Sequence, residues 1–305
     1  MRFLKVTHYL LTRITILVLL LLLLVSGYFL WSNSRTYSAA EDVYESLLQL
    51  KPEETEEGKA DFSELRKANP DVCGWLTVTG TKIDYPVVQG KDNLYYMNRD
   101  YYGNPSLAGS IFLDTRNNSS FSDAYSLVYG HHMDDHLMFG DLDLFKDEQF
   151  FRLNSTATIL TEDRVLHLQV LALLEQPDSV EEIFDPSRWE SDLSQFGAFI
   201  KDNAVYVRES ALKELRDKPT MVQAVSLVTC ASGHTGTRTV LVLIAPRTDS
   251  PGTPEPDAPS ETPSKPPAKT GDTLFNSPML WGGLLGVSLM TLIAARLIEK
   301  RRKKN

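Results

Sequence analysis

Short β-rich runs separated by Gly, Pro, Asn and Asp recur through the middle of this 305-residue chain, and they constrain its fold more than any other feature. Val, Ile, Leu, Thr and aromatic residues dominate each run and favour strands, whereas the residues between the runs favour turns. The runs cover residues 75–78, 83–88, 110–113, 126–129, 157–160, 165–174, 224–229 and 239–244. This spacing predicts a mainly β domain that closes on itself.

Two regions depart from this rhythm. Residues 180–215 carry aromatic and aliphatic side chains at helical spacing, which predicts a helix-bearing insertion before the run at 224–229. Residues 39–50 and 60–68 show similar spacing. We therefore expect an N-terminal helical extension ahead of the β domain.

Three residues with complementary chemistry stand on separate runs. Cys230 ends the run Ser226-Leu227-Val228-Thr229-Cys230, Arg238 begins the next run, and His131 belongs to Tyr129-Gly130-His131 far upstream. A thiolate can attack a carbonyl, an imidazole can move the proton, and a guanidinium can stabilise the oxyanion. The trio therefore indicates thiol acyl transfer.

These motifs resemble those of the class B sortases, which are membrane-anchored cysteine transpeptidases of Gram-positive bacteria. Residues 226–230 match the family's Thr-Leu-x-Thr-Cys, with Ser in place of the first Thr, and residues 129–131 match its Tyr-Gly-His. Residues 71–76, 80–89 and 138–142 are also similar to class B stretches. The resemblance runs from about residue 62 to residue 244, and we take residues 62–247 as the catalytic domain.

The resemblance implies a sortase-type closed β-barrel with Cys230 as nucleophile, His131 as general acid and base, and Arg238 positioning the substrate and stabilising the oxyanion. It implies cleavage after Thr of a Leu-Pro-x-Thr-Gly-like or Asn-Pro-x-Thr-x sorting signal on secreted proteins. The acyl group would pass to an amine of a peptidoglycan precursor or of a pilin. We expect neither a cofactor nor a metal.

The N-terminal end indicates a membrane anchor. Residues 14–31 are almost entirely apolar, long enough to cross a hydrocarbon core of roughly 30 Å. Basic residues within residues 1–13 precede them, so the positive-inside rule places that end in the cytoplasm and the catalytic domain outside the cell. A cleaved signal peptide is the alternative, but the apolar run exceeds the usual core of roughly 7–15 residues. Residues 32–61 would then form the helical extension or stalk.

The C-terminal end has the order linker, apolar segment and basic tail. Residues 248–277 are rich in Pro, Ser, Thr and acidic residues, which predicts an extended linker. Residues 278–295 are apolar, and residues 296–305 form a basic cytoplasmic tail. A second membrane span and a processed sorting signal both fit. The sequence Pro267-Ala268-Lys269-Thr270-Gly271 departs from Leu-Pro-x-Thr-Gly at two positions, so we expect the second span.

The charge balance excludes one class of partner. The chain has 31 Lys and Arg against 40 Asp and Glu, a net charge of −9, and its ends are basic. The part between the ends is therefore more acidic than the whole. Phosphate binding needs clustered cations, which argues against a nucleic-acid partner.

Several alternatives remain open. His234 follows Cys230 closely and is an alternative base. An alternative interpretation is a metal cluster, although the spacing of its residues matches no common zinc pattern. The cluster would consist of His131, His132, Asp134, Asp135 and His136. The alternative functions are a secreted thiol hydrolase and a non-catalytic surface or pilin-like protein anchored by its own C-terminal signal. Cys73 is expected as a small buried hydrophobe rather than a disulfide partner of Cys230.

Overall fold

A computed structural model describes residues 2–55, 58–177, 179–189, 193–230 and 236–247. The described chain divides into two units, residues 2–35 and residues 36–247. One helix, α1 (Arg2–Leu48), contributes to both. Val6–Leu48 is long and apolar enough to cross a membrane. A signal sequence near the N-terminus meets the same criteria of length and composition. The predicted boundary between anchor and extension is therefore not marked by a break in the helix.

The second unit is a closed β-barrel, as the sequence predicted. In the described chain nine strands pair in the order β5-β1-β2-β3-β4-β8-β9-β6-β7, and a further β5–β6 pairing closes eight of them into a barrel. The remaining strand, β7, extends the sheet from β6. The strands are β1 (Val72–Val78), β2 (Asp84–Val88), β3 (Ile111–Leu113), β4 (Tyr125–His131), β5 (Thr156–Leu160), β6 (Val165–Pro177), β7 (Ala204–Val207), β8 (Val222–Cys230) and β9 (Thr237–Pro246).

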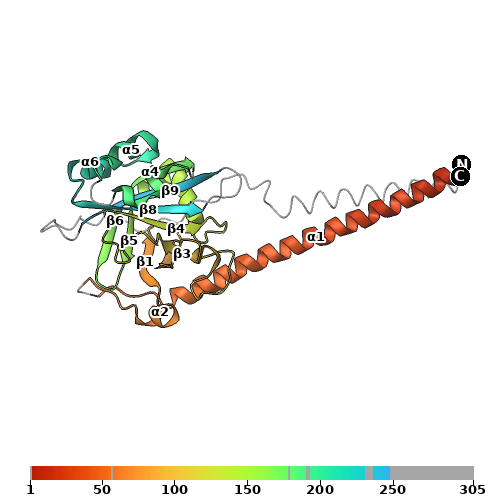
Figure 1. Cartoon of the computed structure of the whole chain (residues 1–305), viewed down its shortest axis with the longest axis horizontal. Coiled ribbons are helices and arrows are strands. Elements are labelled where there is room, and N and C mark those ends of the chain that lie inside the picture. Colours follow the sequence, from red (N-terminus) through yellow and green to blue (C-terminus); the bar gives the residue numbers. More distant parts are fainter. Residues whose placement is uncertain (1, 56–57, 178, 190–192, 231–235, 248–305) are drawn as a thin grey trace. The chain divides into compact units, whose positions relative to one another are not determined.

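Short helices lie ahead of β1 and in the connections between the strands. Those ahead of the insertion are α2 (Ser63–Ala68), η1 (Tyr96–Asn98), η2 (Gly140–Lys146) and α3 (Glu148–Leu153). Those of the insertion between β6 and β8 are α4 (Glu181–Phe184), η3 (Pro186–Trp189), α5 (Phe196–Asn203) and α6 (Glu209–Asp217). Figure 1 shows α5 and α6 side by side, next to β6 and β9.

The insertion explains why the runs at 224–229 and 239–244 are almost continuously apolar. In β9, Leu241 and Leu243 belong to the core inside the barrel, whereas Val240 and Val242 pack with the insertion helices. Successive residues of a strand face opposite sides, so a strand covered on both faces loses the apolar–polar alternation. Strands β8 and β9 are thus held rigidly between two packed layers.

Helices are present in the regions where the sequence predicts them, but two of the predicted helical stretches are longer than the observed helices. Of residues 60–68, only Ser63–Ala68 is helical. The expected helical stretch 180–215 contains β7, which pairs antiparallel with β6. The last turns of α1 pack on the barrel: Tyr37, Ala40 and Tyr44 contact its core.

Candidate active site

His131 and Cys230 lie at the ends of two neighbouring strands that run in the same direction. Strand β4 pairs parallel with β8 over seven positions, from Tyr125 opposite Ala224 to His131 opposite Cys230. Because hydrogen bonds between parallel strands are evenly spaced, the register holds to the last pair. Two residues from distant parts of the sequence therefore become Cα partners at one edge of the barrel.

Arg238 is the second residue of β9, the strand on the other side of β8. Strand β9 pairs antiparallel with β8, with Val240 opposite Val228. At the next position towards the end of β8, the backbone N–H of Thr239 donates to Oγ1 of Thr229 at 3.0 Å. The pairing thus brings the start of β9 beside the end of β8. Arg238 precedes Thr239 and Cys230 follows Thr229, so each is next in sequence to a member of this hydrogen-bonded pair.

The His131 ring is fixed by a backbone carbonyl. Its Nε2 lies 2.6 Å from the carbonyl oxygen of Met97 in η1. A carbonyl only accepts hydrogen bonds, so Nε2 carries a proton and donates it. In the neutral ring Nδ1 is then the basic nitrogen.

Gly109 permits this arrangement. Its φ is +63°, and a Cβ there would lie 2.6 Å from the Met97 carbonyl oxygen and 2.9 Å from Cδ2 of His131. Any side chain would push the carbonyl or the ring away. Gly130 has a related role, since a Cβ there would meet the ring of buried Phe139 at 2.8 Å, which explains the glycine of Tyr-Gly-His.

The Arg238 guanidinium lies against the insertion. Its Cζ is 5.6 Å from the centroid of the Phe184 ring, at the end of α4. Its Nε is buried and has no hydrogen-bond partner in the described part of the chain. A buried, unpaired donor of a permanent cation is suited to receive an acceptor from a bound molecule.

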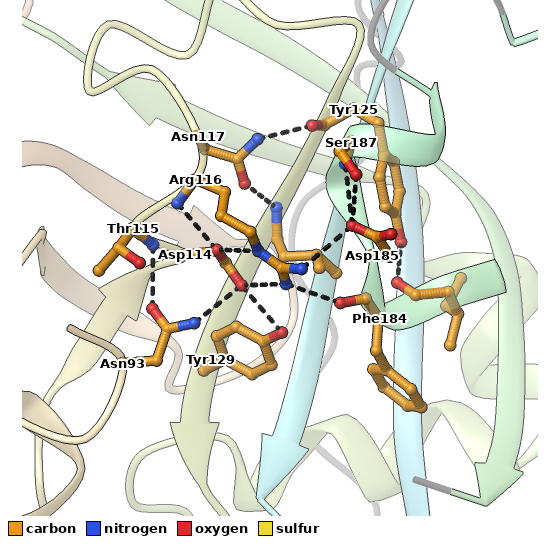
Figure 2. Close-up of polar contacts among 12 residues, drawn as sticks. Asn93, Asp114, Thr115, Arg116, Asn117, Tyr125, Tyr129, Phe184, Asp185 and Ser187 are labelled. Carbon is orange, nitrogen blue, oxygen red and sulfur yellow. Dashed lines mark hydrogen bonds and ion pairs between the residues drawn. The ribbon is translucent and has the colours of Figure 1, made fainter. Parts of the chain in front are cut away.

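A buried carboxylate network holds Phe184 in place (Figure 2). Asp114 follows β3, and its fully buried carboxylate accepts from Nε and Nη2 of Arg116 at 2.9 and 2.8 Å. It also accepts from Asn93 at 3.0 Å and from the hydroxyl of Tyr129 at 3.3 Å. Burial alone would raise the pKa of Asp114, but the hydrogen bonds from Arg116 outweigh it and lower that pKa.

Arg116 connects this network to the insertion. Its Nη2 donates to the carbonyl oxygen of Phe184 at 2.8 Å, and its Nη1 contacts the Asp185 carboxylate at 3.0 Å. Figure 2 shows Arg116 between Asp114 on one side and Phe184 and Asp185 on the other. No sequence pattern indicates these contacts, because Arg116 and the helix end at Phe184 are far apart in the chain.

The remaining histidine and cysteine predictions have three outcomes. His132 and His136 pair with the carboxylates of Asp143 and Asp141, and among the described residues no group of three or more His, Cys, Asp and Glu is placed to hold a metal. His234 lies outside the described residues. Cys73 is a free thiol, half-buried rather than fully buried, and its Sγ donates to the Val87 carbonyl at 3.4 Å.

Comparisons with known proteins agree with this architecture, although no protein-family model matches the chain. Sortase B of Listeria monocytogenes is 33% identical over 150 residues, which cover 49% of this chain and 61% of the relative. Sortase B of Staphylococcus aureus is 26% identical over 233 residues, which cover 75% and 93%.

Solved structures extend the similarity to the fold. A Streptococcus pyogenes class B sortase involved in pilus biogenesis is 36% identical, with a TM-score of 0.53, over 60% of this chain and 97% of that one. Clostridium perfringens sortase B is 29% identical, with a TM-score of 0.53, over 60% and 98%. With the closed barrel and the strand order that joins β4, β8 and β9, these similarities show that the chain belongs to the class B sortase family.

Proposed function

We propose that this protein is a cysteine transpeptidase in which Cys230, His131 and Arg238 act together. The observation that carries the proposal is the Cα pairing of His131 with Cys230 at the ends of β4 and β8, in a chain of the class B sortase family. The pairing with β9 through Thr229 and Thr239 adds Arg238 to the same edge.

The reaction proceeds in two acyl transfers. The thiolate of Cys230 attacks the carbonyl carbon of Thr in the sorting signal, and a C–S bond forms. As the tetrahedral intermediate collapses, the C–N bond after Thr breaks and protonated His131 gives its proton to the leaving amine. An incoming amine then attacks the thioester, neutral His131 takes its proton, and the thiolate leaves.

The hydrogen bond to Met97 supports one nitrogen of His131 as the site of the proposed proton transfers. Because Nε2 donates to the carbonyl in either protonation state, Nδ1 is the nitrogen that gains and loses the catalytic proton. Arg238 donates to the oxyanion or to the Thr carbonyl, and its unpaired Nε is the donor best placed to do so without breaking an existing bond.

The substrates are secreted proteins with a Leu-Pro-x-Thr-Gly-like or Asn-Pro-x-Thr-x signal. The acceptor is an amine of a peptidoglycan precursor or a pilin lysine, and the pilus role of the S. pyogenes relative makes the pilin a specific candidate. We place the barrel outside the cell with α1 as a membrane anchor, and residues 278–295, outside the described part of the chain, as a second span.

The direct test uses the full-length protein in detergent micelles with fluorogenic peptides that contain either signal, with and without triglycine. We expect cleavage after Thr, a thioester at Cys230 that hydroxylamine releases, and a triglycine adduct as main product when the amine is in excess. Cys230→Ala should show no cleavage. Cleavage by that variant would overturn the proposal, and a purely hydrolytic product in excess triglycine would identify a thiol hydrolase instead.

A further inference from the structure

Asp143 connects the immediate neighbours of all three residues proposed above for catalysis. It lies in η2, outside the strands that carry those residues. Its Oδ2 accepts from Nε2 of His132 at 2.9 Å, and its Oδ1 accepts from Oγ1 of Thr239 at 3.2 Å. His132 follows His131 and Thr239 follows Arg238, so one carboxylate binds the side chains next to the proposed base and the proposed cation.

Thr239 also connects Asp143 to Thr229, the residue next to Cys230. Its backbone N–H donates to Oγ1 of Thr229, the residue before Cys230, at 3.0 Å. Thr229 and Thr239 are 3% and 6% exposed, so water does not compete effectively for the bond between them. A continuous hydrogen-bonded path therefore runs from His132 through Asp143 and Thr239 to Thr229.

The electrostatic surroundings keep Asp143 ionised. Burial opposes its charge, but hydrogen bonds from His132 and Lys146 outweigh that effect and hold the pKa of Asp143 at about 2. Nζ of Lys146 lies 3.0 Å from Oδ1 of Asp143 and 3.0 Å from Oε1 of Glu175, so the two carboxylates share one ammonium group. Hydrogen bonds to an ionised acceptor are shorter and roughly twice as strong as neutral ones.

From this geometry we infer that Asp143 is a positioning residue, which fixes the ends of β4, β8 and β9 relative to one another and thereby sets the distances among His131, Cys230 and Arg238. The inference rests on the proposed function of those three residues. A displacement of about 1 Å among reacting groups costs on the order of 10²-fold in rate. The contacts of Asp143 lie beside the reacting groups rather than on a substrate, so its loss should lower kcat and leave KM nearly unchanged.

The experiment compares three variants of the full-length protein in detergent micelles, with kcat, KM and melting temperature measured for each. Asp143→Ala should lower kcat by about 10-fold or more. Asp143→Asn keeps one accepting oxygen and should fall between that variant and the wild type. Glu175→Gln is the matched control: it removes a carboxylate from the same ion-pair cluster but leaves the bonds of Asp143 to His132 and Thr239, and should retain kcat.

A second measurement separates positioning from general loss of stability. Thr239→Val removes the hydroxyl bond to Asp143 and keeps the shape of the side chain. If both residues act through one path, the effects of Asp143→Ala and Thr239→Val on kcat should be clearly less than additive in the double variant. Full additivity, or an unchanged kcat in Asp143→Ala, overturns the inference.

Failure of the positioning role of Asp143 can be distinguished from failure of the proposed function. If wild-type protein turns over no sorting-signal peptide, the function is wrong, and alkylation of Cys230 by iodoacetamide still tests the positioning role. In a Cys73→Ala background, Asp143→Ala should shift the pH profile of that alkylation and Glu175→Gln should not. Identical profiles would overturn the role of Asp143 without any reference to turnover.

Discussion

His131 is the Cα partner of Cys230 in the parallel pairing of β4 with β8, and each is the last residue of its strand. The pair is the last of seven paired positions, so its backbone is held by the ladder, and the His131 carbonyl also accepts from the backbone N–H of Phe139 at 3.0 Å. A site built on packed strands is placed more precisely than one built on loops.

Replacement of His131 and of its neighbour should give very different results. His131→Ala should lower kcat/KM by about 10²–10⁴-fold, the usual contribution of a general acid and base. His132→Ala should cost only a few-fold, since its ring transfers no proton in the proposed reaction and the bond of Asp143 to Thr239 remains. His167→Ala, an exposed strand position, serves as the control. Peptide cleavage rates decide the matter, and a reversed order would move the proton transfer to His132.

Gly109→Ala should impair catalysis without a change in any ionisable group. The new methyl group would collide with the Met97 carbonyl and the His131 ring, so the bond that fixes Nε2 should break. We expect a loss of about 10²-fold in kcat, the cost of a misplaced reacting group. Gly103→Ala is the matched control, because its φ is also positive but nothing crowds its Cβ closer than 4.0 Å. Equal activity in the two variants would show that the Met97 bond is dispensable.

Arg238→Lys should be nearly as damaging as loss of the side chain. An ammonium group keeps the charge but cannot reproduce the planar fork or its contact with the Phe184 ring. Loss of one oxyanion donor typically costs on the order of 10²–10³-fold in kcat. Steady-state kinetics with a sorting-signal peptide measure this directly. Near-normal turnover by the Lys variant would reduce Arg238 to a diffuse positive charge.

Acid should weaken the Asp114–Arg116 network. The folded-state pKa of Asp114 is lowered, so its contribution to stability is present above the unfolded value near 4 and is lost as pH falls through the folded value. Arg116→Gln should reduce the free energy of unfolding by about 1–3 kcal/mol at pH 7 and flatten its dependence on acid pH. Arg152→Gln removes only an exposed pair with Glu148 and should have little effect in urea titrations.

Cys73 should be inert towards alkylating agents at neutral pH. Burial raises the pKa of its thiol to about 12, so almost no thiolate is present. Cys73→Ala should therefore keep most of the wild-type activity, and brief treatment with iodoacetamide should label Cys230 first. Peptide mass spectrometry reads the labelled position, and preferential labelling of Cys73 would contradict the expectation.

The sequence allowed the barrel to be predicted but not its assembly. Each expected β run overlaps a strand, with two runs beginning one residue early, because alternation and turn residues are local signals. The register that pairs His131 with Cys230 depends on long-range packing and left no local mark. Strand β7 was missed because its four residues lie between the amphipathic helices α5 and α6, whose spacing dominates the pattern.

In the candidate site, too, some residues could be selected from the sequence and others could not. Cys230, His131 and Arg238 stand in recognisable motifs, so their selection as catalytic residues was possible from sequence, and their roles stay predictions. The residues around them do not stand out. Gly109, Arg116 and Asp143 lie in loops or short helices without periodicity, and each matters only through a partner far away in the chain.

The parallel pairing of β4 with β8 also has a consequence for how the protein matures. About a hundred residues separate His131 from Cys230, and closing a loop of that length carries an entropic cost that only the finished barrel offsets. In the unfolded chain no ladder therefore holds these two residues together. Under the proposed function, transpeptidase activity should therefore appear only once the barrel has closed, and a partly folded chain should leave peptide bonds intact.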